Sequence, residues 1–402
     1  MGHSVHDSRY SWFRLLITVL IGTVANVGIW AVIVIMPAVE AEFGASRADA
    51  SLPFTLTMIG FALGNLFLGQ MVDRLGVTRA LIGAACLSAA CYTLASFAPS
   101  IAALSLIHLG LGFGTAIGFG PLIADISHWF QRRRGIAVAL VASSNYLSGA
   151  IWPTLLAGML RDSGWQQVYL ALAMVTLITV IPLSLLLRRQ MPEEDLRSAA
   201  AQVQVNARSA GMSPRMLQFA LGLAGIGCCV AMSMPQVHII SYCVGLGYGP
   251  AAGAEMLSLM LLGGVVSRVI SGLVADRLGG LRTLLIGSAL QGTALFLFLP
   301  YDGLVPLYVI SALFGLSQGG IVPSYALVVR EYLPPREAGA RVGFVLMMTI
   351  FGMAIGGWMS GWLYDVTGSY TAAFVNGIAW NGLNLVILLA LLHRSRPRPL
   401  VA

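Results

Sequence analysis

The sequence contains no lysine, and charged residues make up only 10% of its 402 residues. A soluble domain carries about 25% charged residues, so this composition excludes an ordinary soluble fold. Hydrophobic residues reach 57% and the mean hydropathy is +0.83, which predicts a polytopic membrane protein whose surroundings are the lipid bilayer. The formal net charge of +7 arises because 23 arginines outnumber the 16 acidic residues. The positions of these arginines follow membrane topology rather than a nucleic-acid footprint.

Catalytic and metal-binding patterns are also missing. No His-Glu-x-x-His or Gly-x-Ser-x-Gly motif occurs, and the glycine-rich run Gly110–Gly120 lacks the Lys-Ser/Thr ending of a phosphate loop. That run is better explained by close packing of membrane helices. The five cysteines lie in or beside apolar segments, without metal-ligand spacing. We therefore predict a protein that is not an enzyme and has no cofactor and no metal.

The apolar runs predict an all-α membrane protein with twelve transmembrane helices in two six-helix halves, because about 20 apolar residues span a bilayer. Residues 1–190 form the N-terminal half, 191–213 a cytoplasmic linker within a long polar stretch, and 214–402 the C-terminal half. The first run is too long for a signal-peptide core. The predicted spans are Leu15–Met36, Ser51–Val72, Ala80–Phe97, Ile101–Ala124, Gly135–Leu160, Trp165–Leu187, Met216–Ile240, Ala251–Ala275, Thr283–Pro300, Val305–Val329, Val342–Leu363 and Ala372–Leu392.

Arginine distribution predicts the orientation of these spans. With twelve spans, 20 of the 23 arginines fall on the side that carries both termini. The other side receives only Arg47 and Arg161, and Arg268 lies within a span. The positive-inside rule then places both termini in the cytoplasm, in a multi-pass protein of the cytoplasmic membrane.

An internal repeat relates the two halves. The segment Gly69–Arg79 reads Gly-x-x-x-Asp-Arg-Leu-Gly-x-x-Arg and recurs as Gly272–Arg282, an offset of 203 residues. Asp162 recurs as Asp365 at the same offset. In each copy the Asp-Arg pair can interact with neighbouring helix ends, and the following glycine permits a tight turn.

These loops make the sequence resemble the major facilitator superfamily over essentially its whole length. The resemblance implies two halves related by an axis along the membrane normal, substrate binding between them at mid-membrane, and rocking between outward- and inward-open states. It also implies that Asp73, Arg74, Asp276 and Arg277 form a cytoplasmic gate. We expect a monomer.

Arg268 is the strongest candidate for substrate binding. A permanently charged guanidinium in hydrocarbon must face a cavity or a partner. Gly264, Ser267, Ser271 and Gly272 lie beside it on the helix and predict an open niche, which suits a carboxylate. The alternative is a structural ion pair with a buried acid on another helix.

Three features resemble the monocarboxylate porter and oxalate/formate antiporter branch: Arg268 in span 8, the segment from His128 to Gly135, and the Asn-Tyr segment Ser143–Pro153 of span 5. Span 11 lacks the second cation of oxalate porters, so one guanidinium predicts a monocarboxylate substrate. The lysine of span 1 and the acid of span 8 found in animal monocarboxylate porters are absent, and Gly264 occupies the place of the acid. Proton symport therefore needs another carrier, and Asp125 and His128 are the candidates.

The remaining cavity-lining candidates come from spans that the resemblance implies: Asn26, Trp30, Phe119, Asn145, Tyr146, Gln318, Tyr325 and Phe351. For each aromatic residue, packing between helices is an equal alternative. An amide in lipid is costly unless it faces the interior, which favours Asn145 and Gln318. Transport or export of a neutral or amphipathic molecule, such as a vitamin, an aromatic compound or a drug, stays open.

Overall fold

A computed structural model describes residues 6–130, 133–189, 213–332 and 338–394. Within these residues the regular structure is helical, without strands. The predicted linker lies almost wholly outside the described residues, as does part of the segment after span 4. The helices are α1 Arg9–Ala25, α2 Val27–Phe43, α3 Arg47–Leu75, α4 Val77–Ser96, α5 Ile101–Thr115, η1 Ala116–Gly118, α6 Gly120–Trp129, α7 Arg134–Leu185, α9 Pro214–Gly245, α10 Gly249–Leu278, α11 Gly280–Leu297, α12 Leu304–Gln318, α13 Ile321–Tyr332, α14 Ala338–Thr367 and α15 Tyr370–Arg394.

Eleven stretches of the described chain are long and apolar enough to cross a membrane. One of them, Ile136–Leu185, has 50 residues, about 75 Å at 1.5 Å per residue, which is far more than the roughly 30 Å of a bilayer core. It contains a non-helical turn at Gly164, with φ 81° and ψ 166°. If α7 is counted as two crossings that meet at this turn, the number of candidate spans rises from eleven to the twelve that the apolar runs predicted.

Three predicted spans are broken near their middle. Span 1 divides at Asn26 into α1 and α2, span 4 passes through the short 3₁₀ helix η1, and span 10 divides after Gln318 into α12 and α13. Such breaks leave backbone groups without intrahelical partners, so they are tolerated at membrane depth only where protein or a cavity surrounds them. Apolar composition alone did not reveal them.

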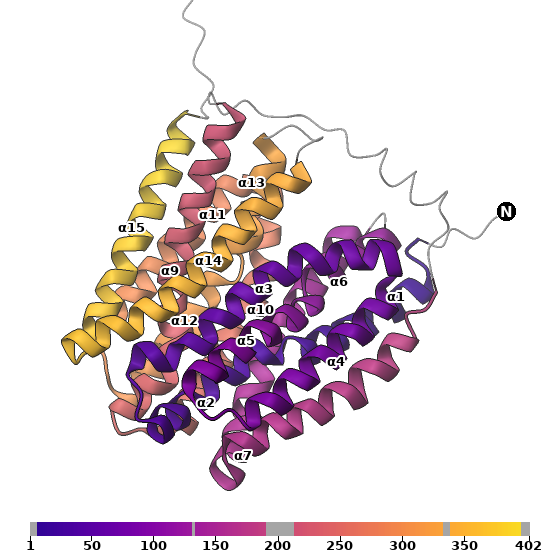
Figure 1. Cartoon of the computed structure of the whole chain (residues 1–402). Helices are drawn as coiled ribbons and strands as arrows, with labels where there is room; N and C mark the ends of the chain where they lie inside the picture. Colours follow the sequence, from indigo (N-terminus) through magenta and orange to yellow (C-terminus); the bar gives the residue numbers. More distant parts are fainter. Residues whose placement is uncertain (1–5, 131–132, 190–212, 333–337, 395–402) are drawn as a thin grey trace, which may run out of the picture.

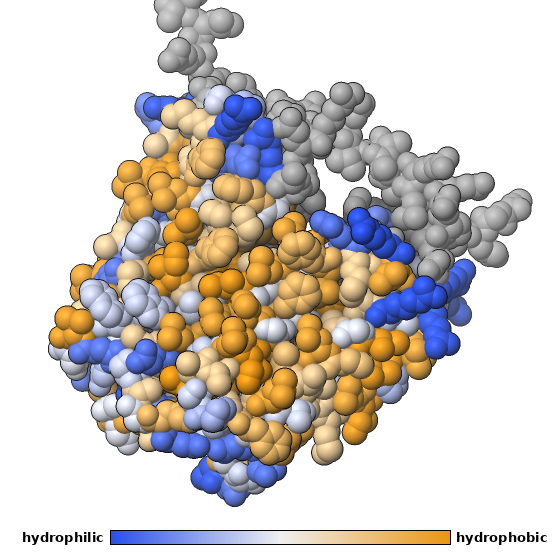
Figure 2. Space-filling view, viewed as in Figure 1, coloured by the Kyte–Doolittle hydropathy of each residue, from blue (hydrophilic) through white to orange (hydrophobic). Residues whose placement is uncertain are grey.

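Figure 1 shows two bundles, one from α1–α7 in indigo to magenta and one from α9–α15 in rose to yellow. They meet along two seams, where α14 packs on α3 and α10 packs on α7. We call the side where α1 begins and α15 ends the termini side, and the side where α2 passes into α3 the far side. Hydrophobic side chains cover the middle of the face in Figure 2, while hydrophilic ones gather toward its ends. Leu106, Ile178 and Val386 are exposed members of the apolar surface of the molecule.

The internal repeat is visible in the packing. A methyl group at Gly112 would lie 2.0 Å from the Thr57 carbonyl oxygen, and one at Gly315 would lie 2.2 Å from that of Met260. Both residues of the second pair stand 203 positions after those of the first. The turns repeat too, because α3 ends at Gly76 with φ 82° and α10 at Gly279 with φ 83°. The glycines of the repeated motif therefore make the tight turns that the sequence predicted.

Candidate functional site

Arg268 lies in the second half of α10, at the seam with α7, and only 8% of the residue is exposed. Its Nε donates to the carbonyl oxygen of Gly319, at 3.1 Å, and its Nη1 donates to that of Ala142. The guanidinium carbon lies 4.0 Å from the ring centroid of Tyr146. Ala142 and Tyr146 belong to α7, so this arginine contacts both halves of the molecule.

The break in span 10 explains one of these bonds. The chain leaves helical hydrogen bonding after Gln318, and the carbonyl of Gly319 accepts from Arg268. A cation is favourable at the C-terminal end of a helix, where carbonyl groups point outward. The two helices pack closely here, because a methyl group at Gly319 would lie 2.0 Å from the Gly264 carbonyl oxygen. This close packing brings the Gly319 carbonyl within hydrogen-bonding distance of Arg268.

The niche beside Arg268 differs from the sequence prediction. Gly264 faces the Tyr146 ring, which lies 2.8 Å from where a methyl group would stand, and Ser271 packs against Gly320. Only at Gly272 is the space open within 4 Å. The small residues thus allow an aromatic ring and a neighbouring helix to pack closely beside Arg268. They do not leave the open niche that the sequence predicted. Sequence spacing identified the small face but not what fills it.

The charge of Arg268 has no counter-ion in the described chain. The ion pairs found there join Arg14 to Asp125, Arg47 to Glu40 and Arg161 to Asp162. The alternative of a structural ion pair with a buried acid is therefore not realised in this part of the chain. A buried guanidinium that holds only neutral partners suits an anionic ligand.

Three of the predicted residues form one network beside this arginine. Asn145 Nδ2 donates to Asn26 Oδ1 at 3.1 Å, and Trp30 Nε1 donates to the carbonyl oxygen of Asn145 at 3.0 Å. Asn26 Nδ2 also donates to the carbonyl oxygens of Gly22 and Gly118. Asn26 therefore satisfies backbone groups at the breaks of spans 1 and 4. Asn145 precedes Tyr146, so this network and Arg268 share one region of α7.

Two further candidates lie beside the broken helices. Phe119 follows η1 and packs on Phe61, with ring centroids 6.0 Å apart. Gln318 ends α12, immediately before the carbonyl that Arg268 binds, and its Oε1 accepts from Gln236 Nε2. Its own Nε2 is buried without a hydrogen-bond partner. Gln236 was absent from the sequence prediction, although its polar side chain within an apolar run was a usable signal.

Tyr325 and Phe351 lie in other surroundings. The Tyr325 hydroxyl donates to Asn384 Oδ1 at 2.8 Å, and Asn384 in turn donates to Ser288. These bonds tie α13 to α15 and α11 inside the C-terminal half, which matches the packing alternative for an aromatic residue. Phe351 is half-buried on α14. Nothing in the described contacts brings it to Arg268.

Asp125 is held in a buried ion pair. Both of its oxygens accept from Arg14, whose Nε and Nη2 donate at 3.0 and 2.9 Å. Arg14 is 1% exposed, lies 4.4 Å over the Trp129 ring, and donates through Nη1 to the Leu187 carbonyl oxygen. Arg14 immediately precedes the first predicted span, Leu15–Met36, and its burial within α1 was not predicted from the sequence. His128 is half-buried and has interaction partners.

The match to protein families covers both halves. The family model described as Major Facilitator Superfamily matches residues 18–304 and 246–401. The chain belongs to this superfamily. Its apolar helices and family make it a multi-pass membrane transporter.

Curated relatives of this superfamily member include monocarboxylate transporters. Monocarboxylate transporter 13 of Rattus norvegicus is 28% identical over 363 residues, covering 88% of this chain and 83% of the relative. Monocarboxylate transporter 11 of Homo sapiens is 30% identical over 303 residues, covering 69% and 62%. The chain therefore resembles the monocarboxylate branch. Its resemblance to that branch had been inferred from Arg268 and two short segments alone.

Solved structures support the fold. A bacterial homologue of the human lysosomal transporter Spinster, crystallised inward-facing and unoccupied, gives a TM-score of 0.71 at 12% identity and covers 98% of this chain and 100% of its own. The nucleoside transporter NupG, crystallised as a point mutant, gives 0.70 at 15% identity, covering 94% and 99%. At such identities the likeness concerns the major facilitator fold and not the substrate.

The predicted cytoplasmic gate lies on the termini side of this fold. Arg74 and Arg277 stand in the last turns of α3 and α10 and are exposed. The side chains of Asp73 and Asp276 lie outside what the structure describes. Their role in a gate stays a prediction.

Proposed function

We propose that this transporter moves a small organic anion, best matched by a monocarboxylate, across the cytoplasmic membrane by alternating access. The single observation that carries the proposal is the Arg268 guanidinium, buried at the seam of the two halves without a carboxylate partner in the described chain. One fixed cation balances one carboxylate. The names of the curated relatives point to the same substrate class.

The position of Arg268 suggests how binding couples to movement. Nη1 bonds to Ala142 in the opposite half, while Nε stays with Gly319 on its own half. A substrate carboxylate that binds Nη1 and Nη2 competes with the Ala142 carbonyl, and so weakens one contact between the halves. Differential contact of this kind is what allows a ligand to shift a conformational equilibrium.

Orientation and coupling complete the proposal. We place the termini side in the cytoplasm, as the arginine distribution predicts, and treat the protein as a monomer. If a proton accompanies the substrate, Asp125 and His128 remain the candidate carriers, although the ion pair with Arg14 must then open for Asp125 to titrate. Symport, antiport and the direction of transport are left to experiment.

The test replaces Arg268 in proteoliposomes offered labelled monocarboxylates, neutral solutes and cations. Arg268→Ala should abolish measurable monocarboxylate uptake, because truncating one partner of a buried charge pair costs about 2–5 kcal/mol, roughly 30-fold or more in affinity. Arg268→Lys should restore it only partly, since an ammonium lacks the planar fork. Arg161→Ala is the matched control, since its side chain is 75% exposed on the far side. Wild-type affinity in Arg268→Lys would refute the role of the fork.

A second candidate is transport of a neutral or amphipathic molecule. It is favoured by the two backbone carbonyls that Arg268 already binds, which would give the arginine a structural role at the break of span 10. In that case Arg268→Ala, shown to be folded and inserted, keeps transport of a neutral solute from the panel and lowers thermal stability instead.

A further inference from the structure

The N-terminus of α3 is capped by a residue of the other half. The backbone N–H groups of Arg47 and Ala48 donate to the two carboxylate oxygens of Asp365, each at 2.8 Å. The next N–H, that of Asp49, donates to Ser46 Oγ at 3.1 Å. The first three donors of α3 are therefore satisfied, two of them by a carboxylate from the end of α14, at a helix terminus where the dipole favours negative charge.

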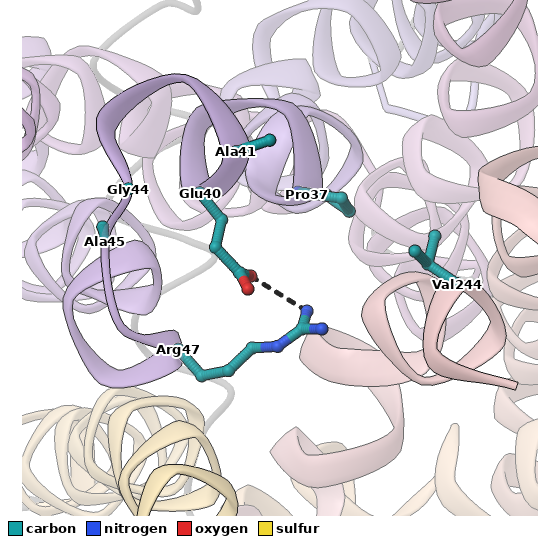
Figure 3. A pocket seen from close by; sticks show the side chains of 7 residues that line it. All are labelled: Pro37, Glu40, Ala41, Gly44, Ala45, Arg47 and Val244. Carbon is teal, nitrogen blue, oxygen red and sulfur yellow. Dashed lines mark ion pairs between the residues drawn. The ribbon is translucent and has the colours of Figure 1, made fainter.

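The side chain of Arg47 makes further contacts at this joint, by which we mean the contact between the start of α3 and the end of α14. It pairs with Glu40 of its own half at 2.9 Å and lies over the rings of Tyr364 and Tyr370, with its guanidinium carbon 5.0 and 6.0 Å from their centroids. Figure 3 shows the pair beside a cavity of about 310 Å³ that Val244 of the other half also lines. Arg47 thus contacts the C-terminal half through both its backbone and its side chain.

The internal repeat supplies a built-in comparison for this joint. Asp162 stands 203 residues before Asp365, just after the predicted end of span 5 on the far side. It pairs with its neighbour Arg161, at 3.0 Å, and the two side chains are 66% and 75% exposed. The N-terminus of α10, which corresponds to that of α3, has no side-chain cap.

Backbone packing shows the same difference between the seams. A methyl group at Gly361 would lie 2.7 Å from the Arg47 carbonyl oxygen, whereas the equivalent Gly158 has nothing within 4 Å. The far-side ends of the two seams therefore differ in their packing. The seam between α14 and α3 has a carboxylate cap at its far end. The seam between α7 and α10 is joined by a hydrogen bond of 2.9 Å between the Thr154 and Ser258 hydroxyls, but it has open space at Gly158 and no such cap among the described residues.

We propose that Asp365 is a far-side latch: its carboxylate, bound to the N-terminus of α3, holds the two halves together while the far side is closed. Far-side opening then begins with release of this cap, at the seam of α14 and α3. The inference rests on the alternating access proposed above, but it requires no particular substrate. Failure of the carboxylate proposal and failure of the latch are therefore separable.

The experiment measures the distance between spin labels on the far side of the full-length protein, without substrate. Labels on cysteines at Phe97 and Val305, which are 74% and 71% exposed in different halves, report separation when the five native cysteines are replaced. Asp365→Ala should raise the ratio of long to short distances about five-fold, the effect of losing roughly 1 kcal/mol of helix capping. Asp365→Asn should raise it less, because its amide keeps one acceptor oxygen. Asp162→Ala is the matched control and should change nothing.

A second pair of variants tests the same joint without altering charge. Gly361→Ala should wedge the seam and lengthen the distance, while Gly158→Ala should not, since the space there is open. All variants are first checked for monodisperse elution and a cooperative thermal transition. A folded Asp365→Ala with the wild-type distance distribution would overturn the latch, as would an equal change in Asp162→Ala. If Asp365→Ala does not fold, an unchanged distance in Gly361→Ala would overturn it.

Discussion

Two buried arginines of this protein have different surroundings. Arg14 has a carboxylate on two of its nitrogens, two backbone acceptors and an aromatic ring. Arg268 has two backbone acceptors and a ring, but no carboxylate in the described chain. Burial of a charge is costly unless it is paired. The charge of Arg14 is therefore balanced by a carboxylate within the protein, whereas the charge of Arg268 has no anion beside it in the described chain.

This contrast yields a prediction at Asp125. Asp125→Ala leaves Arg14 buried and unpaired, and removal of one partner of a buried pair typically costs about 3–5 kcal/mol. We expect a much lower unfolding temperature in detergent. The double variant Arg14→Met, Asp125→Leu should recover most of it, because apolar groups of similar volume can replace a buried pair.

The milder Asp125→Asn separates stability from coupling. If Asp125 carries a proton, this variant loses accumulation driven by a pH gradient but retains exchange of substrate across the membrane. If Asp125 is only the partner of Arg14, both activities fall together with the amount of folded protein. Vesicle assays of gradient-driven uptake and of exchange decide between the two results.

At the scale of helices, two glycines at equivalent positions of the internal repeat let spans approach closely. Gly112→Ala and Gly315→Ala each place a methyl group against the backbone of the crossing helix. Such overpacking costs about 1–3 kcal/mol. Both variants should unfold at lower temperature, by similar amounts if the repeated crossings are equivalent.

The control for this prediction is Gly83→Ala on α4, where nothing lies within 4 Å. Alanine is the better helix former, so this change should be neutral or stabilise by about 0.4–1 kcal/mol. Thermal unfolding of the three variants, followed in the same detergent, makes the comparison. Equal destabilisation at Gly83 would show that the loss comes from glycine itself and not from the crossing.

The helices also show how far the sequence could be interpreted. Hydrophobic runs predicted the spans because their length is set by the bilayer, and the glycine of each repeated motif predicted a turn that the structure contains at Gly76. The break at Asn26 was not predicted, and the side chain there donates to the carbonyl oxygen of Gly118, 92 residues away. The contact of Asp365 with α3 depends on how the halves meet. Long-range geometry of this kind leaves no local pattern.

For the whole molecule, the first prediction concerns orientation. A cysteine at Asp302, exposed in the loop between α11 and α12, should react with an impermeant maleimide added to intact cells. A cysteine at Arg282, exposed at the termini side, should react only after the cells are opened. A cysteine at Arg208, outside the described residues, should behave like the one at Arg282. The reverse pattern would place both termini outside.

The second concerns the balance between two states. We propose that Asp365 stabilises closure of the far side, and that Asp73, in the repeated loop motif of the termini side, stabilises closure of that side. Each carboxylate then lowers the free energy of a different state, so their losses act in opposite directions on one equilibrium. Asp365→Asn should lengthen the far-side distance between labels at Phe97 and Val305, and Asp73→Asn should shorten it.

The double variant Asp73→Asn, Asp365→Asn gives the sharpest outcome. If both residues bias the same two-state equilibrium, its distance distribution should return toward that of the wild type, while either single variant cycles more slowly because one state dominates. Substrate affinity should change less than turnover, since Asp73 and Asp365 lie near the C-terminal ends of α3 and α14, away from Arg268. A double variant that resembles Asp365→Asn alone would mean that Asp73 has no part in this equilibrium. Normal turnover of Asp73→Asn with greatly reduced affinity would move that residue from the gate to the binding site.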